Sequence, residues 1–153
     1  ATTTRAQVVQ ILYNLAGEPK VTGTMPFTDL TQDWYKDAVL WAYQTGVVAG
    51  TSKTTFAPDA PVTREQLAVL LMEYASRVLK LARTWTPADL SRFPDSGSVS
   101  GWARDALADA VALGLIGGAE IDGTLWLKPQ GQATRAEIAT IFEGMCRGVF
   151  GIG

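Results

Sequence analysis

The sequence contains no histidine and only one cysteine, Cys146. Without histidine there is no imidazole to act as a general base, no Ser-His-Asp arrangement, and most zinc sites lose their usual ligand. A single cysteine cannot form a disulfide within the chain. Because Cys146 lies in an apolar stretch, we interpret it as a small core residue; the alternative is a nucleophilic thiol. We expect no metal and no cofactor.

Positive charge and long apolar runs are also scarce. The 13 Lys and Arg residues are outnumbered by 15 Asp and Glu. The net charge of −2 and the pI near 5.1 argue against binding to nucleic acid or to anionic membranes. No apolar run approaches the roughly 18 residues of a membrane span, so we expect no membrane insertion. No signal peptide is visible, and because residue 1 is not Met, we expect the chain to begin inside a longer or processed protein.

One short motif is present three times. It reads Thr4-Arg5-Ala6-Gln7, then Thr63-Arg64-Glu65-Gln66, then Thr134-Arg135-Ala136-Glu137, and each copy precedes an apolar run. In this pattern the threonine hydroxyl accepts from the N3 amide, and the Glu or Gln side chain accepts from the N-cap amide. The motif therefore predicts helices over about 4–16, 64–82 and 135–147. The first should end at Gly17 in a left-handed conformation.

The arginine of this motif needs its own explanation. Arg5, Arg64 and Arg135 fall at the first helical position, where the helix dipole disfavours a cation by roughly 0.3–1 kcal/mol. One interpretation is that each guanidinium and the free first-turn amides together hold an anion. The alternatives are an ion pair with a carboxylate of the chain itself, or a side chain that extends into water. Because the placement occurs three times, we favour the anion.

A longer unit surrounds the motif and occurs twice. Its ordered landmarks are Phe27-x-Asp29 and Phe93-x-Asp95, Trp34 and Trp102, Gly46 with Gly50 and Gly114 with Gly118, and Pro58 and Pro129. Twelve positions separate the tryptophan from the first glycine in both copies, and four separate the two glycines. The spacing predicts a helix over 34–45 with Asp33 as N-cap, an apolar stripe of Trp34, Ala38, Trp41 and Ala42, and a stop at Gly46. Residues 83–92 are expected to form a polar linker.

The repeat defines the organisation of the chain. Complete units cover about 27–82 and 93–148, whereas residues 1–17 are only the last helix of another copy. We therefore divide the chain into 1–20 (a partial first repeat), 21–84 and 85–153. Apolar residues make up 47% of the 153 positions. Because short repeats cannot bury their helix faces alone, we expect the three parts to share a core and form one domain.

The ordered landmarks resemble S-layer homology domains, the repeat modules of bacterial cell-surface proteins. The resemblance covers nearly the whole chain and rests on the Phe-x-Asp, Trp, Gly, Pro and Thr-Arg positions above, together with Phe56-x-Pro58 and Val62. It implies a mainly α fold in which the Thr-Arg helices form a pseudo-threefold central three-helix bundle, joined by short connecting helices and loops. It also implies non-covalent attachment to an acidic secondary cell-wall polysaccharide that often carries pyruvate ketals on N-acetylmannosamine. A fused cargo domain and a location at the cell surface would follow.

The resemblance also implies roles for particular residues. Arg5, Arg64 and Arg135 would contact the acidic sugar in grooves between repeats. Asp29 and Asp95 would accept from sugar hydroxyls or orient an arginine, with ordinary turn chemistry as the alternative. Trp34 and Trp102 would form apolar walls, with core packing as the alternative. The four glycines, Gly46, Gly50, Gly114 and Gly118, would let backbone amides approach the ligand; helix stopping would explain the first of each pair equally well.

The sequence departs from the family pattern at several positions. The first repeat lacks its Phe-x-Asp, Trp and glycine segment. In the last repeat Leu127 stands where Phe56 stands, Gln130 replaces Asp59, and the segment after Gly118 is longer. We therefore expect the complete unit around Arg64 to be the first candidate for binding.

Three classes of function are compatible with these features. The first is a carbohydrate-binding anchor without catalytic activity. The second is a protein-interaction or assembly module in which the arginines pair with carboxylates of a partner. The third is an enzyme that uses two carboxylates, as glycoside hydrolases do, with Asp29, Asp95 and Glu120 as candidates; nothing in their spacing indicates the required pair. We favour the anchor.

Overall fold

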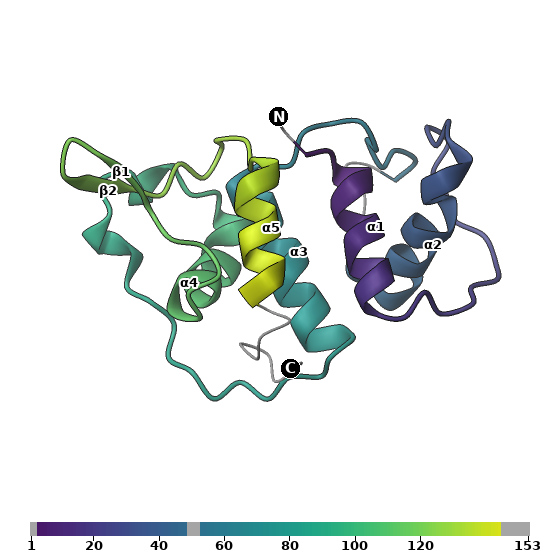
Figure 1. Ribbon diagram of the computed structural model, residues 1–153, viewed down its shortest axis with the longest axis horizontal. Helices are drawn as coiled ribbons and strands as arrows, with labels where there is room; N and C mark the ends of the chain where they lie inside the picture. Colours follow the sequence, from purple (N-terminus) through teal and green to yellow (C-terminus); the bar gives the residue numbers. More distant parts are fainter. Residues whose placement is uncertain (1–2, 49–52, 145–153) are drawn as a thin grey trace.

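The structure, a computed structural model, describes residues 3–48 and 53–144 and is mainly helical in this part of the chain (Figure 1). The α-helices are α1 (Arg5–Leu15), α2 (Lys36–Thr45), α3 (Arg64–Arg77), α4 (Arg104–Ala112) and α5 (Arg135–Gly144). Short 3₁₀ turns are η1 (Asp33–Tyr35), η2 (Leu90–Arg92), η3 (Ser96–Ser98) and η4 (Gly101–Ala103). One antiparallel hairpin joins β1 (Ala119–Ile121) to β2 (Thr124–Trp126). None of the described helices is long and apolar enough to cross a membrane.

The three Thr-Arg motifs open helices as predicted. Thr4 and Thr63 form complete capping boxes with Gln7 and Gln66, respectively. Thr134 accepts from the Glu137 amide at 3.1 Å, and Oε1 of Glu137 accepts from the Thr134 amide at 3.4 Å. Each arginine is therefore the first residue of its helix, which fixes the direction from which its side chain starts.

The ends of the predicted helices are less accurate. Gly17 has the expected positive φ of 88°, but α3 ends at Arg77 instead of residue 82. The chain turns away at Lys80, whose φ of 53° cannot continue a helix. Asp33 is not the N-cap of the second helix but the first residue of η1, and its carboxylate pairs with Lys36 at 3.0 Å. The predicted end of the last helix and Cys146 lie outside the described residues.

The helices pack across the boundaries between repeats. Helix α2 packs on α1, and α4 packs on α3, so each Trp-led segment covers the Thr-Arg helix of the unit before it (Figure 1). The shared core contains large side chains with at most 1% exposure from every part, among them Leu12, Tyr35, Phe56 and Tyr74. Burying this apolar surface at roughly 25 cal/mol per Å² is what holds the repeats together.

The connectors between α2 and α3 and between α4 and α5 fold over the starts of the preceding Thr-Arg helices. The amides of Arg5 and Ala6 donate to the carbonyls of Ala60 and Pro58 at 2.9 and 3.0 Å. In the next repeat, the equivalent amides of Arg64 and Glu65 donate to Gly131 and Pro129 at 2.9 and 3.0 Å. Because a helix start leaves its first amides without intrahelical partners, these bonds give the first two amides of α1 and α3 their acceptors.

The segment 83–92 is not a free linker. Arg83 donates to both carboxylate oxygens of Asp109 on α4 at 2.7 and 2.8 Å, and the Trp85 ring nitrogen donates to the same carboxylate at 3.1 Å. Asp109 is 4% exposed, so the carboxylate of this ion pair is buried away from water. The segment is therefore attached to α4 along the groove between α3 and α4, where the sequence suggested only a boundary.

Candidate functional site

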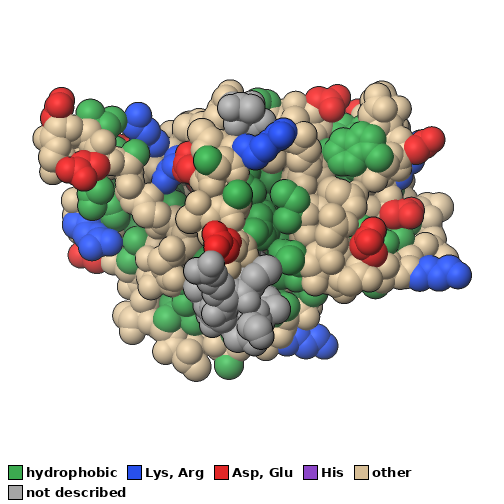
Figure 2. All heavy atoms as spheres, viewed as in Figure 1, with side chains coloured by type: hydrophobic (Ala, Val, Ile, Leu, Met, Phe, Trp, Pro, Cys, Tyr) green, Lys and Arg blue, Asp and Glu red, His purple; other side chains and the backbone are tan. Residues whose placement is uncertain are grey.

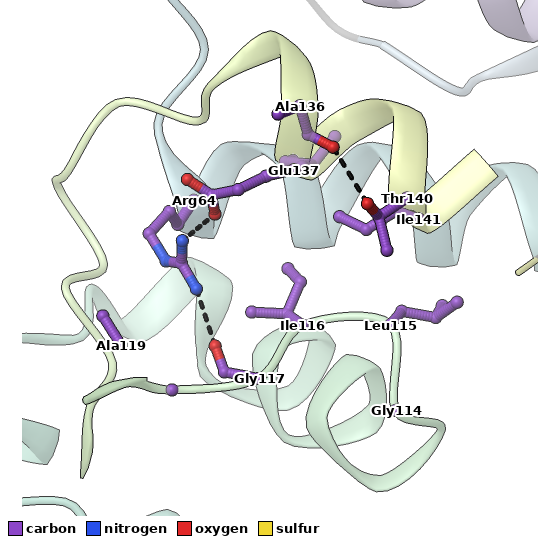
Figure 3. A pocket seen from close by; sticks show the side chains of 12 residues that line it. Arg64, Gly114, Leu115, Ile116, Gly117, Ala119, Ala136, Glu137, Thr140 and Ile141 are labelled. Atoms are coloured by element: carbon purple, nitrogen blue, oxygen red, sulfur yellow. Dashed lines mark hydrogen bonds and ion pairs between the residues drawn. The ribbon is translucent and has the colours of Figure 1, made fainter. Parts of the chain in front are cut away.

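A first pocket of about 530 Å³ lies between α3, α5 and the segment 114–119. Arg64 and Leu67 line it from α3, and Glu137 and Ile141 line it from α5 (Figure 3). Its floor is mostly apolar, with backbone groups of the glycine-rich segment on one side. This is the pocket that the sequence favoured.

Each of the three guanidinium nitrogens of Arg64 has a partner within the protein. Its Nε donates to the Leu127 carbonyl at 3.1 Å and one terminal nitrogen donates to the Gly117 carbonyl at 2.6 Å. The other terminal nitrogen is paired with the Glu137 carboxylate (Figure 3). The Arg64 side chain is only 12% exposed. For this arginine the alternative interpretation holds, since it pairs with an acid of the chain itself.

A second pocket of about 450 Å³ lies between α1 and α5. It is lined by Gln7 and Ile11 of α1, by Arg135 and Ile138 of α5, and by Trp34 of η1. Figure 2 shows apolar side chains gathered in a hollow near the middle of the molecule, with a basic side chain above it. The walls of this groove are mostly apolar, and charge is contributed at its edge by Arg135.

Arg135 differs from the other two motif arginines. Within residues 3–48 and 53–144, no hydrogen-bond or ion-pair partner is found for its exposed guanidinium, nor any for the amides of Arg135 and Ala136. The prediction that first-turn amides are free is therefore wrong for α1 and α3, where connector carbonyls occupy them, and it stays a prediction for α5. A guanidinium beside open helix N-terminal amides can receive a carboxylate.

Arg5 is built into the core. It is 8% exposed, its Nε donates to the Phe56 carbonyl at 2.9 Å, and its guanidinium carbon lies 4.8 Å from the centre of the Phe56 ring. Burial lowers the pKa of Arg5 below its usual range, and the nearby charge of Asp29 opposes this only in part. The contact repeats in the next unit, where Arg64 donates to Leu127, so Leu127 takes the place of Phe56 as the sequence alignment of the repeats indicates.

The two aspartates of the Phe-x-Asp motif hold connectors in place. Asp29 accepts from the amides of Phe56 and Ala57 at 2.9 and 2.8 Å, and Asp95 accepts from those of Leu127 and Lys128, both at 2.8 Å. Burial acts to raise the pKa of Asp29, but the donated backbone hydrogen bonds and the charge of Arg5 outweigh it, leaving the pKa below its usual value. Local turn chemistry does not describe this arrangement, because each carboxylate accepts from amides of a segment about 30 residues away. The contact of these aspartates with a sugar stays a prediction.

Both tryptophans of the repeat are exposed. Trp34 is 54% exposed and Trp102 is 63% exposed, so the core interpretation of these residues is wrong. The buried aromatic residue beside Trp34 is Tyr35, which packs edge-on against it with ring centres 4.9 Å apart. Trp34 lines the second pocket, as expected of a groove wall. An exposed indole face is the kind of surface on which a sugar ring stacks.

The glycines have structural explanations. Gly46 and Gly114 have φ of 84° and 74° after α2 and α4, as expected of helix stops. A Cβ on Gly118 would lie 3.0 Å from Leu125 and 3.1 Å from Phe93, so this glycine allows the hairpin to pack closely. Gly50 lies outside the described residues. Of this set, Gly114 and Gly118 line the first pocket.

The partners of three acidic residues, one of them in the first pocket, were not foreseen. Glu137 pairs with Arg64, and Glu65, 3% exposed, accepts from the Ser100 amide and hydroxyl at 2.9 and 2.7 Å. Gln130, the residue that replaces the aspartate of the other repeat, also donates to Glu65 at 3.2 Å. Asp109 holds Arg83, as described above. These pairs join residues far apart in sequence, and local motifs do not indicate them.

No group of three or more acidic or cysteine side chains suited to a metal occurs among the described residues.

Segments similar to this chain occur in larger proteins. The sequence pattern of the S-layer homology domain matches residues 26–68 and 92–139. The chain is 35% identical over 143 residues to the surface-layer 125 kDa protein of Lysinibacillus sphaericus. The match covers 93% of the chain and 12% of that protein. It is 31% identical over 147 residues to an amylopullulanase of Thermoanaerobacterium thermosulfurigenes (94% of the chain, 8% of the relative). It is 30% identical over 147 residues to the exoglucanase XynX of Acetivibrio thermocellus (94% and 13%). The chain thus spans only 8 to 13% of the length of these relatives.

Proposed function

Since the chain belongs to the S-layer homology domain family, we propose that it is a non-catalytic anchor that attaches a surface protein to the bacterial cell wall by binding an acidic wall polysaccharide. A surface-layer protein, an amylopullulanase and an exoglucanase all carry the segment, each over a small share of its length. Because these proteins have such different names, the segment they share is better explained by a role in attachment than by a role in catalysis. The remainder of the full-length protein would be the anchored cargo.

One observation carries the choice of an acidic ligand. The open guanidinium of Arg135 and the open amides at the start of α5 lie at the edge of a groove whose wall includes the exposed Trp34. A carboxylate fixed on a sugar, such as a pyruvate ketal on N-acetylmannosamine, would bind the charged end while the sugar face rests on the indole. The groove between α1 and α5 therefore becomes the first candidate, ahead of the Arg64 pocket that the sequence favoured.

We also propose that α1, α3 and α5 are equivalent helices around a pseudo-threefold axis. The residues two positions before the three arginines support this arrangement. The Val62 amide donates to the Thr3 carbonyl at 3.0 Å, and the Ala133 amide donates to the Val62 carbonyl at 2.8 Å. These residues are at most 2% exposed. Such a chain of hydrogen bonds from one unit to the next is what a central axis through the three helix starts would produce.

The proposal is tested with Arg135→Ala and binding to purified wall polysaccharide. Removing one charge-assisted contact of about 1.5–3 kcal/mol should weaken binding about 10- to 150-fold. Arg104→Ala is the matched control, because Arg104 is also an exposed arginine at the first position of a helix but lines neither pocket. Chemical removal of pyruvate from the polymer should reduce binding of the parent chain to the level of Arg135→Ala.

Two results would contradict the proposal. Equal affinity of Arg135→Ala and Arg104→Ala, both folded, would show that the groove between α1 and α5 is not the anion site. A parent chain that binds a protein of the cell envelope and ignores the purified polysaccharide would favour the assembly module instead.

A further inference from the structure

We propose that Glu137 is a specificity-determining residue that closes the Arg64 pocket to carboxylate-bearing ligands and leaves it suited to an uncharged sugar. This inference rests on the proposed carbohydrate-binding function. It starts from the position of the Glu137 carboxylate, which lies against the Arg64 guanidinium inside the pocket where an acidic ligand would have to place its own carboxylate (Figure 3).

The three repeats provide an internal comparison at the Glu137 position. The third residue of α5 is Glu137, whereas the third residues of α1 and α3 are Gln7 and Gln66. Both glutamines accept from their N-cap amides, at 2.9 Å for Gln7 and 3.0 Å for Gln66. The helix cap is therefore complete with a neutral side chain. The negative charge of Glu137 is not needed for capping, and its second oxygen is directed at Arg64.

The surroundings of Arg64 strengthen the argument. Its other two nitrogens already donate to the carbonyls of Leu127 and Gly117, so each of the three guanidinium nitrogens has a partner within the protein. A ligand carboxylate would have to displace Glu137 or lie beside it, and two like charges at one guanidinium repel each other. The rest of the pocket wall offers apolar side chains, including Leu67, Ile116 and Ile141. Such a wall fits the uncharged face of a sugar or an N-acetyl methyl group.

The two grooves would then differ in the charge they accept. The groove between α1 and α5 is lined by Arg135 and the neutral Gln7, whereas the Arg64 pocket is lined by Arg64 and the acidic Glu137. A polymer that alternates acidic and neutral sugars could bind both pockets at once. The identity of one capping residue would decide which unit each pocket accepts.

The test uses Glu137→Gln, which keeps the capping acceptor and removes the charge. Binding of acidic wall-polysaccharide fragments, measured by calorimetry, should strengthen at least about tenfold and become more salt-dependent. Fragments from which pyruvate has been removed should bind the variant and the parent equally. Adding Arg64→Ala to the variant should abolish the gain. The reciprocal change Gln7→Glu, which places a carboxylate in the groove with Arg135, should weaken binding of the acidic fragments about tenfold.

A second measurement does not depend on the wall polymer. In an NMR titration with pyruvate, the Arg64 side-chain Nε–H signal should shift in Glu137→Gln and stay unchanged in the parent chain. Unchanged affinity and an unshifted Arg64 signal in a folded Glu137→Gln protein would overturn the inference. If neither protein binds the polysaccharide while the Arg64 signal still responds to pyruvate only in the variant, the proposed anchor function fails and the role of Glu137 stands.

Discussion

The hydrogen bonds of Asp29 give a prediction whose size can be worked out from the structure. Asp29→Asn keeps one acceptor oxygen and replaces the other by an amide nitrogen, so one of the two amides of Phe56 and Ala57 loses its acceptor. The lost bond was accepted by a charged group, which is worth about 1.5–3 kcal/mol. For a domain of this size that corresponds to a fall in Tm of about 3–12 °C at pH 7.

The same variant should show a defined pH dependence. The pKa of Asp29 in the folded chain lies below the unfolded value of 3.8. A depressed pKa means that the stabilisation is present above the unfolded value and is lost as the pH falls through the lower folded value. The difference in unfolding free energy between Asp29→Asn and the parent chain should therefore be constant from pH 7 to about 5 and shrink below about pH 4.

Urea unfolding followed by circular dichroism, at pH 7 and at pH 3, measures this difference directly. Asp122→Asn, an exposed aspartate in the hairpin turn with φ of 51°, is the matched control and should change stability little, because asparagine tolerates that conformation. Asp95→Asn should cost as much as Asp29→Asn at pH 7, since its two bonds are equally short. A cost that is equal at both pH values, or absent at pH 7, would refute the reasoning that a charged carboxylate holds the connector.

Two further substitutions test other parts of the fold. Thr63→Ala should lower the unfolding free energy by about 0.5–2 kcal/mol through loss of the α3 cap, measured by chemical denaturation; an unchanged value would mean that Gln66 alone secures the helix start. Gly118→Ala should lower the unfolding free energy by about 1–3 kcal/mol, because the new methyl group meets Leu125 and Phe93. Gly117→Ala should be close to neutral, because a Cβ added there meets no other group within 4 Å. Equal melting temperatures of these two alanine variants would show that the hairpin does not pack closely on Gly118.

The starts of the helices could be predicted from the sequence because they depend on local chemistry. A threonine followed three residues later by Gln or Glu sets a capping box whatever the rest of the chain does, and the structure contains it at Thr4 and Thr63. The hairpin 119–126 was missed although its signal was present. Asp122-Gly123 between short β-prone runs favours a tight hairpin turn, and the longer segment after Gly118 is where it occurs.

The roles of the polar residues that recur in both repeats could not be predicted, because they depend on contacts between repeats. Nothing near Asp29 in sequence indicates that its carboxylate oxygens accept hydrogen bonds from amides 27 and 28 residues later. Likewise, helical periodicity placed Trp34 on the buried stripe, but the segment begins as a 3₁₀ turn in which Tyr35 takes the buried position. A 3₁₀ turn has about 3.0 residues per turn instead of about 3.6, so its side chains face directions that α-helical periodicity does not predict.

The arginine that seemed misplaced at a helix start is explained differently in different repeats. In α1 and α3 the connector carbonyls already satisfy the first-turn amides, so the helix end is no longer a bare positive pole, and a carbonyl of Phe56 or Leu127 receives the guanidinium. These two arginines therefore fasten one repeat to the next. At α5 the described chain places no connector over the amides, and Arg135 keeps the full donor capacity that the motif suggested for all three. The same motif thus joins repeats at α1 and α3, where a connector covers the first amides, and its contacts differ at α5. The neighbouring segment, and not the motif alone, therefore determines what each arginine contacts.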